Sequence, residues 1–268
     1  MTLILALACK DGIVFASDSL TTMPVAKDLF TNENIYFKDK ITKIKELGDN
    51  KNKLWAASGN FGIIQQFEQS LVLLQQKHPN FSFSDEVVMN KLQDGFADIL
   101  RHANRIHKRV NDLPEAEMPE TEPPSAQVLI VGCECTEKDE NVLARIFHLD
   151  TNGQSMFWEK DFGYKAIGFD FFALAEPMLR QFKTVKYDIQ LGCFIAYKVL
   201  ADSIAHSTVI GESIDIWTIN NNGSHQLGIY ELVNLEKTYQ WWPDVAKEYF
   251  ETKVVEKLNS FSASELHS

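Results

Sequence analysis

The residue whose chemistry draws attention first is Thr2, directly behind the initiator methionine. Removal of Met1 would give Thr2 a free α-amine and a hydroxyl on the same residue. An α-amine has a reference pKa of about 7.7–8, so it can accept the hydroxyl proton near neutral pH. One residue would then supply both a nucleophile and its base. Thr2 is therefore a candidate nucleophile for acyl transfer, conditional on the loss of Met1.

The segment that must position Thr2 begins at the next residue. Leu3 to Cys9 is a short apolar run, Lys10-Asp11-Gly12 is a turn signal, and Ile13 to Ala16 is a second apolar run. Two apolar runs around such a turn predict a β-hairpin. Asp18 closes the second strand, which brings a carboxylate near the start of the first.

The remaining periodicities predict an alternation of strands and helices. Residues 20–38 are interpreted as a long connection, and Ser84 as the N-cap of the second helix. An acidic, proline-rich stretch over 113–125 predicts an exposed loop. The expected strands cover 41–47, 53–57, 127–135, 142–149, 155–159, 213–220 and 225–231; the expected helices cover about 63–78, 85–110, 171–182, 187–206 and 243–258.

This order predicts an α+β fold in which two sheets are covered by outer helices, as a single domain over 1–268. The chain carries a net charge of −11, which argues against nucleic acid or an anionic membrane as the main partner. No apolar run approaches the ~20 residues of a membrane helix, so we expect a cytoplasmic protein. We expect no metal and no cofactor, since the cysteines lack Cys-x-x-Cys spacing and His102 and His107 lie five apart.

Several residues together resemble the β-type subunits of proteasomes and their bacterial homologues, which are N-terminal-nucleophile (Ntn) hydrolases. Asp18 follows Thr2 by sixteen residues, and Thr22 follows four later. Lys40 begins Lys40-Ile41-Thr42-Lys43-Ile44, Gly59 lies between a strand and a helix, and Gly211-Glu212-Ser213-Ile214-Asp215-Ile216 is similar to a late family strand. The resemblance implies a four-layer αββα sandwich. The bacterial Anbu-type homologues also diverge from the family pattern around this core, and the resemblance extends to them or to a neighbouring branch.

The resemblance also implies roles for these residues. Asp18 and Lys40 would form a pair that keeps a positive charge beside Thr2, and the N–H of Gly59 would stabilise the tetrahedral oxyanion. Three further residues would contact the substrate: Thr22 its backbone, and Ala57 and Phe61 the side chain before the cleaved bond.

The residues that would support Thr2 from further away depart from the family pattern. Aligned on Gly211, Ser207 stands where the family has a carboxylate, Ile210 stands where it has a serine, and Phe169 replaces a serine after Gly168. Ser207 remains a candidate for supporting the Thr2 amine.

Two main functions therefore remain open, beside a third, a distant Ntn fold with unrelated chemistry such as a regulatory module. The first is a threonine peptidase or amidohydrolase acting on a peptide or amide substrate. The second is a catalytically silent subunit with an assembly or binding role. In either case the resemblance implies a homo-oligomer, a ring or a helical stack. No Walker motif is present, so any ATP-driven unfolding would need a separate ATPase.

Overall fold

The computed structural model describes residues 2–252 with gaps at 28–33, 41, 49–50, 112–122, 137–138, 159–162, 169–172, 183–185, 208–209, 212 and 250–251. For some residues, including 20–27 and 34–40, only the backbone is described. By its internal contacts the chain divides into two compact units, 1–227 and 228–268. The single domain expected over 1–268 remains a prediction.

The first sheet is built on the expected N-terminal hairpin, which the structure confirms. Its strand order is β10-β1-β2-β11-β12, and every neighbouring pair is antiparallel. Both strands of the hairpin are almost entirely apolar and almost entirely buried, because the sheet is covered on both faces. The strands are β1 (Leu3–Ala8), β2 (Ile13–Asp18), β10 (Tyr164–Gly168), β11 (Ile214–Asn220) and β12 (Gly223–Gln226).

The second sheet is an antiparallel meander in which each strand pairs with the next along the chain. Its order is β5-β6-β7-β8-β9. The register of its central pair aligns Lys53 with Gly132 and Gly59 with Ala126, so the two ends of β6 are fixed against β7. The strands are β5 (Lys45–Glu46), β6 (Lys53–Gly59), β7 (Ala126–Thr136), β8 (Asp139–Leu149) and β9 (Ser155–Trp158).

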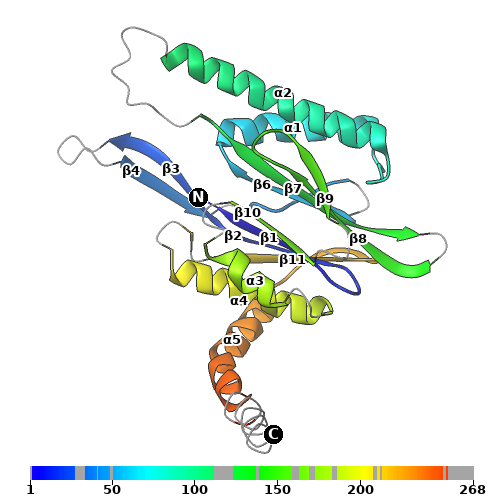
Figure 1. Cartoon of the computed structure of the whole chain (residues 1–268), viewed down its shortest axis with the longest axis vertical. Helices are drawn as coiled ribbons and strands as arrows, with labels where there is room; N and C mark the ends of the chain where they lie inside the picture. Colours follow the sequence, from blue (N-terminus) through cyan, green and yellow to red (C-terminus); the bar gives the residue numbers. More distant parts are fainter. Residues whose placement is uncertain are drawn as a thin grey trace, which may run out of the picture. The chain divides into compact units, whose positions relative to one another are not determined.

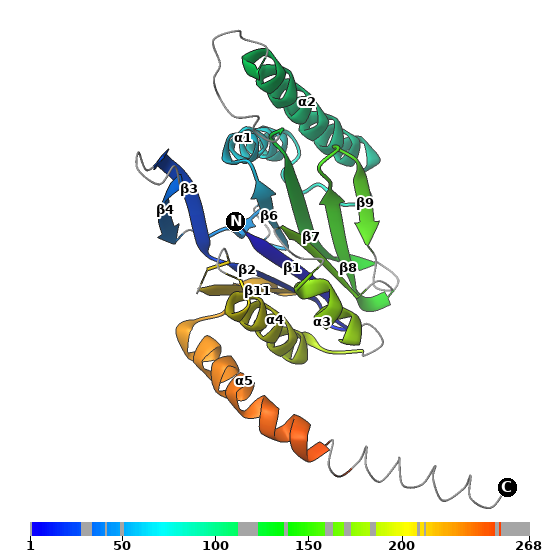
Figure 2. The same ribbon diagram turned by 60° about the vertical axis from the view of Figure 1, so that its left-hand side comes forward.

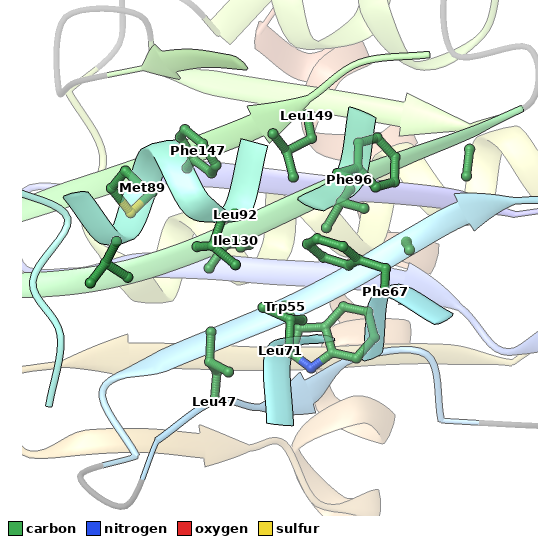
Figure 3. Packing of buried hydrophobic residues seen from close by; sticks show 14 of the residues in the cluster. Leu47, Trp55, Phe67, Leu71, Met89, Leu92, Phe96, Ile130, Phe147 and Leu149 are labelled. Atoms are coloured by element: carbon green, nitrogen blue, oxygen red, sulfur yellow. The ribbon is translucent and has the colours of Figure 1, made fainter. Parts of the chain in front are cut away.

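Helices cover the sheets of unit 1 (Figures 1 and 2). α1 (Phe61–Lys77) and α2 (Glu86–Asn111) pack on the second sheet through their apolar faces, with Phe67 and Phe96 at the centre in edge-to-face contact (Figure 3). α4 (Ile189–Ala205) packs on β2 and β11, and α3 (Ala175–Phe182) contacts α4 and β10. A separate apolar cluster, with Phe15 and Leu129 among its members, joins the two sheets.

These contacts give an α+β structure with two five-stranded antiparallel sheets and, among the described residues, five helices. The α+β class expected from the sequence is confirmed. The Asn60 side chain caps α1 by accepting the Ile63 N–H. α3 begins at Ala175, two residues before Pro177, which places the proline in the first turn where its missing N–H costs nothing.

Several element boundaries differ from the expected ones. Residues 20–40 contain a hairpin, β3 (Leu20–Lys27) and β4 (Asn34–Lys40), where a connection was expected. The alternating 41–47 stretch forms only the two-residue β5. The helix cap lies at Asp85 and not at Ser84, because Asp85 Oδ1 accepts the N–H groups of Val87 and Val88. Most of the proline-rich loop, 112–122, lies outside the described residues.

The second unit consists, in its described part, of the long helix α5 (Ile229–Tyr249). It starts earlier than the helix expected at 243–258 and replaces the last part of the strand expected at 225–231. Pro243 was interpreted as a helix start, but it lies inside α5. No residue of α5 is buried, and apolar side chains such as Ile229, Tyr230 and Trp241 are exposed.

Candidate active site

The carboxylate of Asp18 is the centre to which separate parts of the chain converge. Asp18 is the last residue of β2 and is fully buried. Its Oδ1 accepts the backbone N–H of Leu3 at 2.8 Å, and its Oδ2 accepts the N–H of Gly211 at 3.2 Å. The carboxylate therefore holds the start of β1, immediately after Thr2, against the segment that precedes β11.

The cation beside Asp18 is Lys43. Its Nζ lies 2.8 Å from Asp18 Oδ1, and both side chains are almost completely inaccessible. Burial lowers the pKa of the Lys43 ammonium below its ordinary value, while the charge and hydrogen bond of Asp18 oppose that change. Leu3 N and Lys43 Nζ share one carboxylate oxygen, so they lie no further apart than twice 2.8 Å. A positive charge is thus fixed close to the backbone of residues 2 and 3.

Lys43 occupies the place that the sequence suggested for Lys40. Lys40 is the last residue of β4 and pairs in register with Leu20; its side chain lies outside the described residues. The sequence carried a signal for the alternative, because Lys43 also has an apolar residue four positions later, Leu47. The contact of Lys43 with Asp18 is found only in the tertiary structure, and the role suggested for Lys40 stays a prediction.

Two residues hold the backbone of Thr2 in place. The hydroxyl of Ser58 donates to the carbonyl oxygen of Thr2 at 3.4 Å. Gly168, paired with Leu3 in the β1–β10 ladder, passes so close that a Cβ on it would lie 1.9 Å from the same oxygen. Its φ of +114° also requires glycine. Neither residue was assigned a role from the sequence, and no local pattern reveals that they meet Thr2.

Gly59 is the last residue of β6, directly after Ser58. Its φ is +124°, and an added Cβ would lie 2.3 Å from the carbonyl oxygen of Ser125. Glycine is therefore required here for both its conformation and its lack of a side chain. The neighbouring bond from Asn60 N to Ser125 O, 2.8 Å long, fixes the chain as it leaves the strand for α1. The Ser58–Thr2 bond brings this strand-to-helix turn to the N-terminal residue.

The other candidates are spread around this centre. Ala57 is buried in the core between β6 and α1, Phe61 is the half-exposed first residue of α1, and Ser207 is partly exposed just after α4. Thr22 lies on β3, where it pairs with Lys38, and its side chain is outside the described residues. The substrate contacts and the support by Ser207 stay predictions.

The arrangement places a buried ion pair, Lys43 with Asp18, against the backbone that follows Thr2. Over the described ranges, no group of three or more histidine, cysteine or carboxylate side chains is arranged to hold a metal ion. Within the same ranges, no helix is both long and apolar enough to cross a bilayer.

Comparison with solved structures finds the same fold in Anbu proteins. Anbu (ancestral beta-subunit) from Yersinia bercovieri has a TM-score of 0.60 at 14% identity, covering 93% of this chain and 97% of that one. An Anbu (Gly-1) mutant from Hyphomicrobium sp. strain MC1 has a TM-score of 0.60 at 15% identity, covering 94% and 97%. The helical assembly of the Anbu complex from Pseudomonas aeruginosa has a TM-score of 0.61 at 14% identity, covering 92% of this chain and 96% of that one.

At these identities the likeness shows the fold alone, so the chain shares its fold with these Anbu proteins. No protein-family model matches the sequence, and neither does a sequence among curated proteins.

Proposed function

We propose that the chain is an N-terminal threonine hydrolase, a peptidase or amidohydrolase that uses Thr2 after removal of Met1. The observation that carries the proposal is the buried Asp18–Lys43 pair, whose carboxylate also binds the N–H of Leu3. An ion pair so inaccessible to water is costly to bury, and it is placed against the residue that follows the nucleophile.

The proposed reaction follows from the groups present. Thr2 Oγ attacks the carbonyl carbon of a peptide or amide, and its proton passes to the α-amine of the same residue. The Gly59 N–H stabilises the oxyanion, a contribution of about 3–4 kcal/mol in comparable enzymes. The α-amine then gives its proton to the leaving amine, which leaves an ester on Thr2. Water, deprotonated by the same amine, cleaves that ester and regenerates the enzyme.

Two measurements test the proposal. Intact mass spectrometry of the purified protein should show loss of Met1. A threonine-directed β-lactone should then add one equivalent to the wild-type chain and none to Thr2→Ala. Thr238→Ala is the matched control, because Thr238 is an exposed threonine on α5 and the variant should label like wild type. Absence of labelling in a chain that has lost Met1 would contradict the hydrolase proposal.

A second candidate function is a catalytically silent subunit with an assembly or binding role. The observation in its favour is Ile210, an apolar and buried side chain directly before the Gly211 that contacts Asp18. It stands where the resembled family has a serine that supports the threonine amine. Retention of Met1 in the native protein would favour this function, because the blocked residue lacks the base.

In either function we infer self-association of the subunit, as a ring or a helical stack, in a four-layer αββα arrangement and in the cytoplasm. A helical assembly of the Anbu complex from Pseudomonas aeruginosa supports the inference by its fold. The exposed apolar side chains of α5 offer a surface for contact with a second copy. A separate ATPase partner remains part of the proposal only if folded protein substrates are cleaved.

A further inference from the structure

A cleft of about 450 Å³ lies at the end of the sheets opposite Thr2. Strand β6 shows the separation: Lys53, its first residue, lines the cleft, and Gly59, its last, belongs to the candidate active site. Six strand residues at about 3.3 Å each separate the two by roughly 20 Å. Strand β11 agrees, because Ile214 pairs with Asp18 while Asn220, at its other end, lines the cleft.

The cleft contains a buried lysine without a carboxylate partner. Lys53 is only 6% exposed, and its Nζ lies 3.3 Å from Asn52 Oδ1. The ammonium also lies over the rings of Phe81 and Phe83, 5.2 and 5.8 Å from their centroids. Among the described residues, no carboxylate comes within ion-pair distance of it. Burial lowers the pKa of Lys53, and the charge of Glu134 opposes this change.

The two other charged residues described in the cleft, Glu134 and Arg145, contact each other. Glu134 Oε1 accepts the Ser82 hydroxyl and the Phe83 N–H, each at 2.6 Å, and its Oε2 lies 3.8 Å from Arg145 Nε. The carboxylate is thus bound to the loop between α1 and α2 and to a neighbouring strand. Among the described residues that line the cleft, one acid and two cations sum to one positive charge, and Lys53 is the cation outside the Glu134–Arg145 contact.

The walls of the cleft are tightly packed. A Cβ on Gly132 would lie 2.7 Å from the Phe83 ring, 2.8 Å from Asn52 O and 2.9 Å from Lys53 Cγ. The lysine stem is therefore held by its neighbours and does not lose much further freedom when a ligand binds. A preorganised cation costs less to engage than one on a free surface side chain.

We propose that this cleft binds a small anion with a single carboxylate or phosphate group, contacted by Lys53 and Arg145. The uncompensated charge of Lys53 supplies the attraction, and the fixed Glu134 limits the cleft to one negative group. The asparagine side chains along the wall, such as Asn80 and Asn220, provide donors and acceptors for the polar remainder of the ligand. The ring of Phe81 offers it an apolar surface. This inference is independent of the chemistry proposed for Thr2.

Calorimetric titration of the full chain with inorganic phosphate and with benzoate, at constant ionic strength, tests the proposal. Benzamide, which keeps the ring but lacks the charge, is the negative control. The wild-type protein and Thr2→Ala should bind at least one of the two anions with equal affinity. Lys53→Met should weaken binding by about tenfold or more, because a charge-assisted contact is lost. Binding of phosphate without benzoate identifies a phosphoryl ligand, and the reverse identifies a carboxylate.

Lys51→Met is the matched control, since Lys51 is an exposed lysine two residues away and should leave the affinity unchanged. If Lys53→Met does not fold, Arg145→Gln decides: an affinity weakened at least tenfold supports the proposal, and an unchanged one overturns it. Three other results also overturn it: no binding of either anion, equal loss in Lys51→Met, or a fall in oligomer mass in Lys53→Met without any anion effect. The last would identify the occupant as an acidic segment of a second copy.

Discussion

Replacing Lys43 by methionine removes the cation beside Asp18 while keeping most of the side chain's length. Removal of one partner from a buried ion pair costs about 3–5 kcal/mol, because the other charge stays buried without compensation. Asp18 would keep its hydrogen bonds from the Leu3 and Gly211 N–H groups. We therefore expect the lower end, a loss of about 3 kcal/mol. At about 2–4 °C per kcal/mol for a domain of this size, the Tm should fall by about 6–12 °C.

The interaction itself is isolated by a double-mutant cycle with Asp18→Asn. The double variant replaces both charges, so its destabilisation should be smaller than the sum of the single effects by about 1–3 kcal/mol. Urea unfolding gives the four free energies. Lys45→Met is the control, because Lys45 forms an exposed ion pair with Glu68 that should contribute less than about 1 kcal/mol.

The same experiment tests whether Lys43 or Lys40 is the lysine that interacts with Asp18. Lys40→Met should leave the Tm close to wild type and should be additive with Asp18→Asn. The assignment of Lys43 would be wrong if Lys40→Met destabilised the protein as much as Lys43→Met. Additivity of Asp18→Asn with Lys43→Met to within 0.5 kcal/mol, roughly the additivity error for independent sites, would refute it equally.

Three further changes probe other parts of the molecule. Gly168→Ala should destabilise the protein by about 2 kcal/mol or more in urea unfolding, since an added Cβ would strike the Thr2 carbonyl oxygen at a φ of +114°. Burial lowers the pKa of His148 to about 4. The free energy of unfolding should therefore fall by up to about 3 kcal/mol between pH 6.5 and 4, and His148→Gln should reduce that slope. Trp241→Lys should lower the oligomer mass measured by light scattering, because Trp241 is an exposed aromatic side chain of α5.

Each of these changes has its own comparison. Gly95→Ala, in the interior of α2 with open space around it, should stabilise the protein by about 0.5–1 kcal/mol. For His148 the sign is fixed, because a lowered folded-state pKa means that the unfolded chain binds more protons in that range. Parallel stability curves for wild type and His148→Gln would contradict it. The control for Trp241→Lys is Glu236→Gln, at a polar exposed position of α5, which should leave the oligomer mass unchanged. If Glu236→Gln lowered the oligomer mass as much as Trp241→Lys, the apolar side chains of α5 would not be the contact surface.

The elements closest to the candidate nucleophile could be predicted because their sequence signals are local. The apolar runs of β1 and β2 and the turn between them fix a hairpin within eighteen residues. The helices α1 and α2 follow from their 3.6-residue periodicity, although the cap of α2 was expected one residue early, at Ser84. The β3–β4 hairpin was missed, because its strands lack a clear apolar alternation and pair mainly with each other. Pro243 suggested the wrong start for α5, since a proline can also lie inside a helix.

The sequence by itself determined that Thr2 stands behind Met1, that Asp18 ends the second strand, and that Gly59 lies where a buried strand gives way to a helix. These features are local, and backbone propensity and apolar patterning are enough to place them. Only the tertiary structure decided that Lys43 meets Asp18, that Ser58 bonds to the Thr2 carbonyl and that Gly168 passes close to it. The same holds for the distant cleft around Lys53. Charge pairing and close approach depend on which strand ends lie side by side, and long-range packing sets that arrangement.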